Sequence, residues 1–213
     1  MASSASPVAR SVTDSWIFTH RSWIGAACLA PAGLAVIFSK PWLGEDSALA
    51  LLLDFAGWVF FLAYLAMRVW STLYVGGVKD KVLQTAGPYS ITRNPLYVGG
   101  FCFALSIAFF LKSASLAVLT LLAAIAFARW VVPAEEEALE SIFGESYREY
   151  KRRVPRMLPR PSLYGADATV EVRLRALRTE AKRLFTAAMM PILIFILLHF
   201  RNAPWWPHWF MLP

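Results

Sequence analysis

The chain has 213 residues, of which 58% are hydrophobic and only 16% are charged. Soluble domains usually carry about 25% charged residues, so the composition excludes an ordinary water-soluble domain and indicates a surface that largely faces lipid. The net charge of +7 fits either nucleic acid or a membrane surface. The distribution of the basic residues, described below, favours the membrane and argues against nucleic acid. The length suggests one domain over residues 1–213.

The chain begins with a Ser- and Ala-rich stretch, residues 1–15, whose composition predicts a disordered tail. Apolar runs follow, and a helix needs about 17–25 residues to span a bilayer. The second and fourth runs are long enough, whereas the first, third and fifth need flanking residues. The runs are Trp23–Phe38, Ala48–Trp70, Leu96–Leu111, Ala114–Val132 and Leu184–Phe200. They predict an all-α, polytopic membrane bundle of about five transmembrane helices.

The basic residues are unevenly distributed around these runs. If the N-terminus is cytoplasmic and the helices alternate in direction, only Lys40, Lys112 and Arg201 of the 21 Lys and Arg residues fall outside. Cytoplasmic loops of membrane proteins are enriched in Lys and Arg. This rule predicts a multi-pass protein with a cytoplasmic N-terminus and two cytoplasmic regions, 71–95 and 133–183.

The second cytoplasmic region predicts two amphipathic helices. Apolar residues recur every three or four positions over 139–154, and Gly144 is expected to bend that helix. The stretch 161–183 has apolar residues on one face and basic residues elsewhere. This pattern predicts an interfacial basic helix, followed by the last transmembrane helix over 184–200.

Asp54 is an acidic residue within the second apolar run. Ionisable residues inside membrane spans are functional candidates by default. A hydrogen bond to a neighbouring helix explains the residue equally well, and the sequence alone favours neither interpretation.

Cysteine and histidine show no metal-binding pattern. Cys28 and Cys102 lie inside apolar runs without Cys-x-x-Cys or Cys/His spacing. The three histidines, His20, His199 and His208, are far apart in the sequence. We therefore expect no metal site and no disulfide framework.

The first group of chemically informative residues stands just before the third run. Pro95 suits the first turn of a helix, because its missing N–H would be unpaired there anyway. Arg93 then lies at the positive end of the helix dipole, where an anionic group binds favourably. The pair Gly99–Gly100 permits a close backbone approach. An arginine that reaches phospholipid headgroups explains Arg93 equally well.

The second group is the acidic triplet Glu135-Glu136-Glu137, which follows the fourth run. Carboxylates near an anionic leaflet are unfavourable unless a cationic group binds there. Acidic residues also stabilise the first turn of a helix, but this effect does not explain why all three are present. The triplet therefore indicates a site for a cationic group.

These elements follow one another in a defined order. Gly-Pro-Tyr at 87–89 precedes Arg-Asn-Pro-Leu-Tyr-Val-Gly at 93–99, then the glutamates, then Phe-Gly-Glu-Ser-Tyr-Arg-Glu-Tyr-Lys-Arg-Arg-Val-Pro-Arg at 143–156. Over roughly residues 76–160 the chain resembles the isoprenylcysteine carboxyl methyltransferases and their relatives, the membrane phospholipid N-methyltransferases. The resemblance implies an enzyme that uses S-adenosylmethionine to methylate a lipophilic substrate at the cytoplasmic face.

The resemblance also implies roles for individual residues. Arg129 and Glu136 would be catalytic, since the family places basic residues near the substrate entrance and has paired glutamates. Asn94 stands where eukaryotic members have His, and Asn can donate a hydrogen bond but cannot titrate. The cofactor pocket would be lined by Lys81, Val82, Leu83, Gln84, Tyr89, Arg93, Asn94, Pro95, Tyr97, Glu135 and Glu136.

These residues match the charges of S-adenosylmethionine. Arg93 suits its carboxylate, Glu135 or Glu136 suits its ammonium, and an aromatic face such as that of Tyr89 or Tyr97 favours its sulfonium. A carboxylate or thiolate acceptor needs alignment and a dry site but no general base. The scarcity of His therefore favours O- or S-methylation of a lipid-like or prenylated substrate in the bilayer.

Other functions fit part of the sequence. A phospholipid N-methyltransferase and a small-thiol S-methyltransferase share the cofactor chemistry. Sterol-type reductases that bind NADPH have a similar Arg-x-Pro-x-Tyr motif, but usually carry an acid where this chain has Gly100. A non-catalytic membrane scaffold is the remaining alternative. The chain has no Gly-x-Gly-x-x-Gly loop after a strand, which argues against a soluble Rossmann-type methyltransferase.

Overall fold

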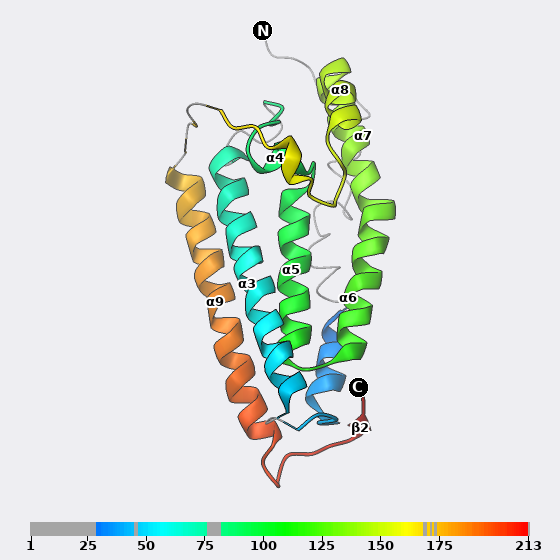
Figure 1. Cartoon of the computed structure of the whole chain (residues 1–213), viewed down its shortest axis with the longest axis vertical. Helices are drawn as coiled ribbons and strands as arrows, with labels where there is room; N and C mark the ends of the chain where they lie inside the picture. Colours follow the sequence, from blue (N-terminus) through cyan, green and yellow to red (C-terminus); the bar gives the residue numbers. More distant parts are fainter. Residues whose placement is uncertain are drawn as a thin grey trace.

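The computed structural model describes residues 29–44, 47–75, 82–167, 170, 172 and 174–212. A short helical segment over residues 29–37 precedes the main helices. Four long helices then form the bundle in Figure 1: α3 Ala48–Val75, α5 Pro95–Phe110, α6 Ala114–Ala126 and α9 Leu174–Arg201. The predicted tail over 1–15, residue Lys81 and most of the first half of the run Trp23–Phe38 lie outside the described residues.

The long helices alternate in direction along the chain (Figure 1). One end of the bundle therefore carries α4 Pro88–Ile91, α7 Val132–Phe143 and α8 Glu145–Arg153, and is called the α7–α8 end below. The opposite end carries the turn between α5 and α6 and the C-terminal segment.

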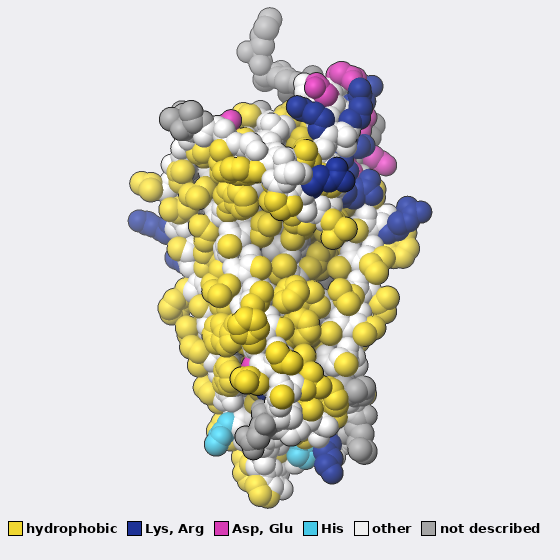
Figure 2. Space-filling model, in the orientation of Figure 1, with side chains coloured by type: hydrophobic (Ala, Val, Ile, Leu, Met, Phe, Trp, Pro, Cys, Tyr) yellow, Lys and Arg dark blue, Asp and Glu magenta, His cyan; other side chains and the backbone are white. Residues whose placement is uncertain are grey.

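Three helices in the described part of the chain are long and apolar enough to cross a membrane: Ala48–Val75, Ala114–Phe143 and Leu177–Arg201. Helix α5 is apolar but has 16 residues, or about 24 Å at 1.5 Å per residue. It is thus shorter than a hydrocarbon core of about 30 Å. Hydrophobic side chains cover most of the face in Figure 2, while acidic and basic side chains gather at the α7–α8 end. These features confirm the predicted helical membrane bundle.

The helix that contains the fourth apolar run continues beyond the predicted end at Val132. Helix α6 passes through a π-helical turn, η1 Phe127–Val131, directly into α7. Pro133 explains the π-helical turn, because proline has no N–H to donate and its ring clashes with the carbonyl group four residues earlier. Gly144 then separates α7 from α8 with a φ of 57°, which glycine adopts without strain. The predicted bend at this glycine is confirmed.

The last helix differs from the prediction of two separate elements over 161–183 and 184–200. Residues 161–167 hold only a short 3-10 turn, η2 Pro161–Leu163, and α9 runs unbroken from Leu174 to Arg201. An ion pair between Glu180 and Arg68, with Nε and Oε1 2.6 Å apart, attaches the basic half of α9 to α3.

Helices α3 and α5 pack closely because glycine lies at their interface. A Cβ atom at Gly57 would lie 2.7 Å from the Phe110 ring, and one at Gly99 would lie 3.2 Å from Cβ of Met67. The predicted close approach thus holds for Gly99. Gly100 is exposed and has open space around its Cβ position.

The opposite end of the bundle is held by polar contacts. Lys112 Nζ in the α5–α6 turn lies 3.2 Å from Asp54 Oδ1, which supplies the partner that the sequence left open. Arg201 is buried and donates from Nε and Nη2 to the carbonyl oxygen of Ser39. Strand β1 Ser39–Lys40 pairs in parallel with β2 Phe210–Met211. These contacts join the two ends of the described chain.

Candidate active site

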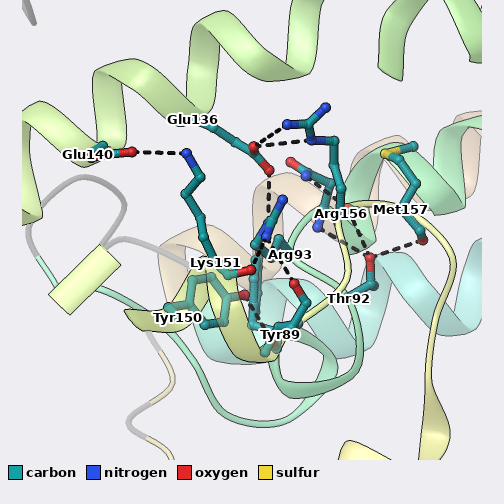
Figure 3. A network of polar contacts seen from close by, with 11 residues as sticks. Tyr89, Thr92, Arg93, Glu136, Glu140, Tyr150, Lys151, Arg156 and Met157 are labelled. Atoms are coloured by element: carbon teal, nitrogen blue, oxygen red, sulfur yellow. Dashed lines mark hydrogen bonds and ion pairs between the residues drawn. The ribbon is translucent and has the colours of Figure 1, made fainter. Parts of the chain in front are cut away.

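The candidate site lies at the α7–α8 end, where the start of α5 meets α7, α8 and the segment after α8 (Figure 3). Gly87 begins this region with a φ of 60°, and a Cβ atom there would overlap the Tyr74 ring. Pro88 opens α4 and Pro95 opens α5. Between them, Arg93 and Asn94 stand directly before the N-terminus of α5, as the sequence predicts.

Arg93 is nearly enclosed by protein, with a side chain that is 8% exposed. Its Nε donates to Glu136 Oε1 over 2.9 Å. Its Nη1 donates to the carbonyl oxygens of Lys151 and Val154 over 2.6 and 3.0 Å. The last carbonyl groups of a helix have no hydrogen-bond partner within the helix. Arg93 therefore donates to the free carbonyl groups at the end of α8 while it also forms an ion pair with Glu136 in α7.

The three glutamates of α7 have different surroundings. Glu136 is buried, and its second oxygen accepts from Arg156 Nε over 3.1 Å. Glu135 is half-buried, and its Oε2 accepts from the Tyr97 hydroxyl over 2.7 Å. Glu137 is exposed. Adjacent positions on a helix point in different directions, about 100° apart, which explains why neighbouring carboxylates have such different partners.

The segment 154–165 runs along the residues that precede α5. The backbone N–H of Arg93 donates to the carbonyl oxygen of Pro155 over 2.9 Å. Asn94 Nδ2 donates to the carbonyl oxygen of Arg156 over 3.0 Å, and Thr92 Oγ1 donates to that of Met157, also over 3.0 Å. These hydrogen bonds attach the segment 154–165 to residues 92–94.

A cluster of tyrosines lies beneath this network. The Tyr150 hydroxyl donates to the carbonyl oxygen of Tyr89 over 2.7 Å, and the rings of Tyr147 and Tyr150 meet edge to face. Burial raises the pKa of Tyr89, and the charge of Glu135 raises it further. Burial followed by the Glu136 charge likewise raises the pKa of Tyr147. These phenols therefore stay protonated and neutral.

Residues 47–146 of the chain match the family described as phospholipid methyltransferase. This match, which covers slightly less than half of the chain, shows that the region is similar to that family. The chain is also 29% identical over 206 residues to the nickel-cobalt-cadmium resistance protein NccN of Alcaligenes xylosoxydans xylosoxydans, a match that covers 96% of this chain and 95% of that relative.

Two further relatives match shorter parts. The cobalt-zinc-cadmium resistance protein CzcN of Cupriavidus metallidurans is 42% identical over 105 residues, 48% of this chain and 47% of the relative. The protein-S-isoprenylcysteine O-methyltransferase of Schizosaccharomyces pombe is 37% identical over 81 residues, 38% of this chain and 34% of that enzyme. The chain thus spans less than half of either relative. No solved structure matches the chain significantly.

The family match and the isoprenylcysteine relative confirm the resemblance that the motifs indicate. They support a membrane methyltransferase of the phospholipid and isoprenylcysteine type. The matched region ends at residue 146. It therefore contains the start of α5 and the glutamates of α7, but not the segment 154–165 that covers them.

The predicted pocket residues of this phospholipid methyltransferase region occupy distinct positions. The contacts above pair Arg93 with Glu136, link Asn94 to Glu136 through Arg156, and separately pair Tyr97 with Glu135. Tyr89 lies in α4 next to the tyrosine cluster. Leu83 packs against that cluster, Gln84 Nε2 donates to the carbonyl oxygen of Tyr74, and Val82 is exposed.

Arg129 lies apart from this network. It is exposed on η1, six residues before Glu135 and so about 9 Å away along the helix axis. No role is predicted from the sequence for Tyr147, Tyr150, Lys151 or Arg156, although all four stand in the motif at 143–156. Their presence in that motif is the sequence signal that could indicate a role. The sequence does not show their partners, because these lie in other elements.

Proposed function

We propose that the protein transfers a methyl group from S-adenosylmethionine to a lipid-like or prenylated acceptor at the cytoplasmic face of the membrane. One observation carries this proposal: motif residues about forty positions apart in the sequence converge at one end of the bundle. Arg93 Nε lies 2.9 Å from Glu136 Oε1, and Tyr97 Oη lies 2.7 Å from Glu135 Oε2.

The residues present fit the cofactor by the chemistry of their polar groups. The half-buried Glu135 carboxylate is suited to an ammonium group. The Asn94 amide, the second terminal nitrogen of Arg93 and the N-terminus of α5 are suited to a carboxylate. The rings of Tyr89 and Tyr97 supply aromatic faces for a sulfonium. In this proposal Val82, Leu83, Gln84 and Pro95 form the remaining wall.

The bound cofactor supplies an electrophilic methyl group, which forms a bond to the acceptor oxygen or sulfur as its bond to the sulfonium breaks. This chain's residues would hold the cofactor in line with the acceptor and exclude water. The buried, protonated tyrosines are consistent with a site of low water content. No histidine lies in the motif segments 87–99, 135–137 or 143–156, which supports an acceptor that needs no general base.

We assign to Arg129 the binding of the methyl acceptor. It is exposed on η1 beside Trp130, which is 72% exposed, within an apolar membrane-spanning helix. Arginine on a lipid-facing surface extends its charge toward headgroups, and it is suited to the anionic group of an amphiphile. This position supports an acceptor that reaches the site from the bilayer.

The printed names of two relatives refer to metal resistance. Within the part of the chain that the structure describes, no group of three or more His, Cys, Asp or Glu residues could hold a metal ion.

Isothermal titration of the purified protein in detergent tests the function. We expect heat on addition of S-adenosylhomocysteine and none on addition of NADPH. Heat with NADPH alone would instead indicate the sterol-type reductase, and silence with both ligands would indicate a scaffold. Transfer of labelled methyl from the cofactor into total lipid and protein extracts then identifies the acceptor class.

A further inference from the structure

The first part of α9 presents two basic side chains on the face that points away from α3. Glu180 is buried and pairs with Arg68 of α3, so its position marks the inner face of α9. Arg178 and Lys182 stand two positions before and after Glu180, and helix positions two apart point about 200° apart. Both side chains therefore face outward, and both are exposed.

Arg178 and Lys182 repel each other. They are four positions apart, which makes them neighbours on one helix face, and like charges at this spacing destabilise a helix. In the part of the chain that the structure describes, no ion pair joins either side chain to a carboxylate, whereas Arg183 beside them lies 3.5 Å from Glu180. An anion between Arg178 and Lys182 would remove this repulsion.

The two side chains stand at the depth of lipid headgroups. Helix α9 ends at Arg201, at the opposite end of the bundle. Lys182 lies 19 residues before that end, or about 28 Å along the helix axis, and Arg178 lies one turn further, at about 34 Å. The hydrocarbon core of a bilayer is about 30 Å thick. Lys182 therefore reaches the boundary of the core, and Arg178 reaches the headgroup layer just beyond it.

The surface beside these side chains is hollowed. An open groove of about 410 Å³ is lined by Leu174, Arg178, Thr179 and Lys182. Figure 2 shows basic side chains that protrude from the edge of the molecule formed by α9, with hydrophobic side chains around them. In Figure 1, α9 forms one edge of the bundle, whereas α6 and α7 stand at the other edge. The groove is thus separate from the candidate active site.

We propose that this groove binds the phosphate of an anionic phospholipid from the leaflet around the α7–α8 end. The guanidinium of Arg178 is suited to two phosphate oxygens, and the ammonium of Lys182 supplies a point charge at the edge of the acyl layer. Phe185 is 69% exposed one turn deeper on the same helix and is available to the acyl chain. The inference goes beyond the proposed function, and no methyl transfer is needed to test it.

Native mass spectrometry of the delipidated full-length protein in detergent tests the site, because it counts bound lipids one by one. The probes are dioleoylphosphatidylglycerol, which is anionic, and dioleoylphosphatidylcholine, whose phosphate is neutralised by its own choline. We expect the first phosphatidylglycerol to bind at least about tenfold more tightly than phosphatidylcholine, and the double variant Arg178→Gln with Lys182→Gln to lose about 30-fold in phosphatidylglycerol affinity.

Two further variants separate the site from net charge and from folding. Arg152→Gln with Arg153→Gln removes the same charge at exposed positions of α8, and this protein should bind phosphatidylglycerol like the parent. Exchanging the two residues, Arg178→Lys with Lys182→Arg, keeps both charges and should keep most of the affinity. Without lipid, the double Gln variant of α9 should unfold at the parent's temperature or above, because the repulsion is gone.

Thermal unfolding in mixed micelles gives a second measurement. Phosphatidylglycerol should raise the unfolding temperature of the parent more than that of the double Gln variant of α9, because a ligand stabilises the state that binds it. Equal binding of the two lipids by the parent, or an equal loss for the α8 control, would overturn the inference. Displacement of phosphatidylglycerol by excess inorganic phosphate would also overturn it, because the site would then take a free anion from water.

Discussion

At the residue scale, Tyr150 links the tyrosine cluster to the segment that carries Arg93. Its hydroxyl donates to the carbonyl oxygen of Tyr89. Burial raises the pKa of Tyr150, and the neighbouring Tyr147 and Tyr89 raise it further. The folded protein therefore keeps this phenolic proton at a pH where the unfolded chain loses it. The resulting stabilisation is fully present below about pH 10, the ordinary tyrosine value, and is lost as the pH rises further.

The substitution Tyr150→Phe tests this effect. Near pH 8 we expect a loss of roughly 0.5–1.5 kcal/mol of folding free energy, because the carbonyl group of Tyr89 loses its donor. Above about pH 10 the variant should lose less stability than the parent as the pH rises. Thermal unfolding in detergent from pH 8 to 11, followed by tryptophan fluorescence, measures both effects (the range brackets the ordinary pKa of about 10).

Tyr164→Phe makes the same chemical change at an exposed ring and is the matched control. If the parent and Tyr150→Phe lose stability equally between pH 9 and 11, a range around the ordinary pKa of about 10, the buried proton of Tyr150 contributes nothing.

At the element scale, one buried ion pair joins α9 to α3. Arg68 donates from Nε and Nη2 to the two oxygens of Glu180, over 2.6 and 2.8 Å. The side chains are 19% and 7% exposed. A buried pair gains little net stability over apolar packing, but it penalises every arrangement of the helices that separates the two charges. The pair thus fixes the register of α9 against α3.

Removing one charge of this pair should be far more harmful than removing both. Glu180→Gln leaves Arg68 buried without its countercharge, and we expect a loss of about 3–5 kcal/mol. The double substitution Arg68→Leu with Glu180→Leu should recover most of that stability. Chemical unfolding in mixed micelles measures the difference.

Glu145→Gln is the matched control, because it removes one charge from the exposed Arg152–Glu145 pair. Exposed pairs contribute only about 0–1 kcal/mol. Equal losses for Glu145→Gln and Glu180→Gln would contradict a special role of the buried pair.

At the scale of the whole molecule, the two ends of the bundle differ in charge and in chemistry. The α7–α8 end carries most of the charged side chains visible in Figure 2 and the candidate site. The opposite end holds the Asp54–Lys112 pair and the buried Arg201. Because basic loops are retained on the cytoplasmic side, we expect the α7–α8 end to face the cytoplasm.

Cysteine labelling in intact cells tests this orientation. A variant with Cys28→Ser and Cys102→Ser receives a single cysteine at Glu149 in α8 or at Asn202 after α9, both exposed positions. A membrane-impermeant maleimide should label the Asn202→Cys protein in intact cells and the Glu149→Cys protein only after permeabilisation. Labelling in the reverse order would place the candidate site on the outside.

The sequence determined the features that depend on local pattern. Long apolar runs must become helices in lipid, because every backbone polar group has to be satisfied within the segment. Pro95 placed the start of α5, Gly144 placed the bend after α7, and the order of motifs identified the family region. Each of these signals lies within a few neighbouring residues, so no knowledge of the packing was needed.

Only the tertiary structure decided which charges pair. Arg93 and Glu136 are 43 residues apart, and Arg68 and Glu180 are 112 residues apart. The choice of Glu136 over Glu135 as the partner of Arg93 depends on the rotation of α7 relative to α5. The pairing of Glu180 in α9 likewise depends on a countercharge in α3. Such pairings follow from the relative positions of whole helices, which the packing of the bundle sets and the local sequence pattern does not.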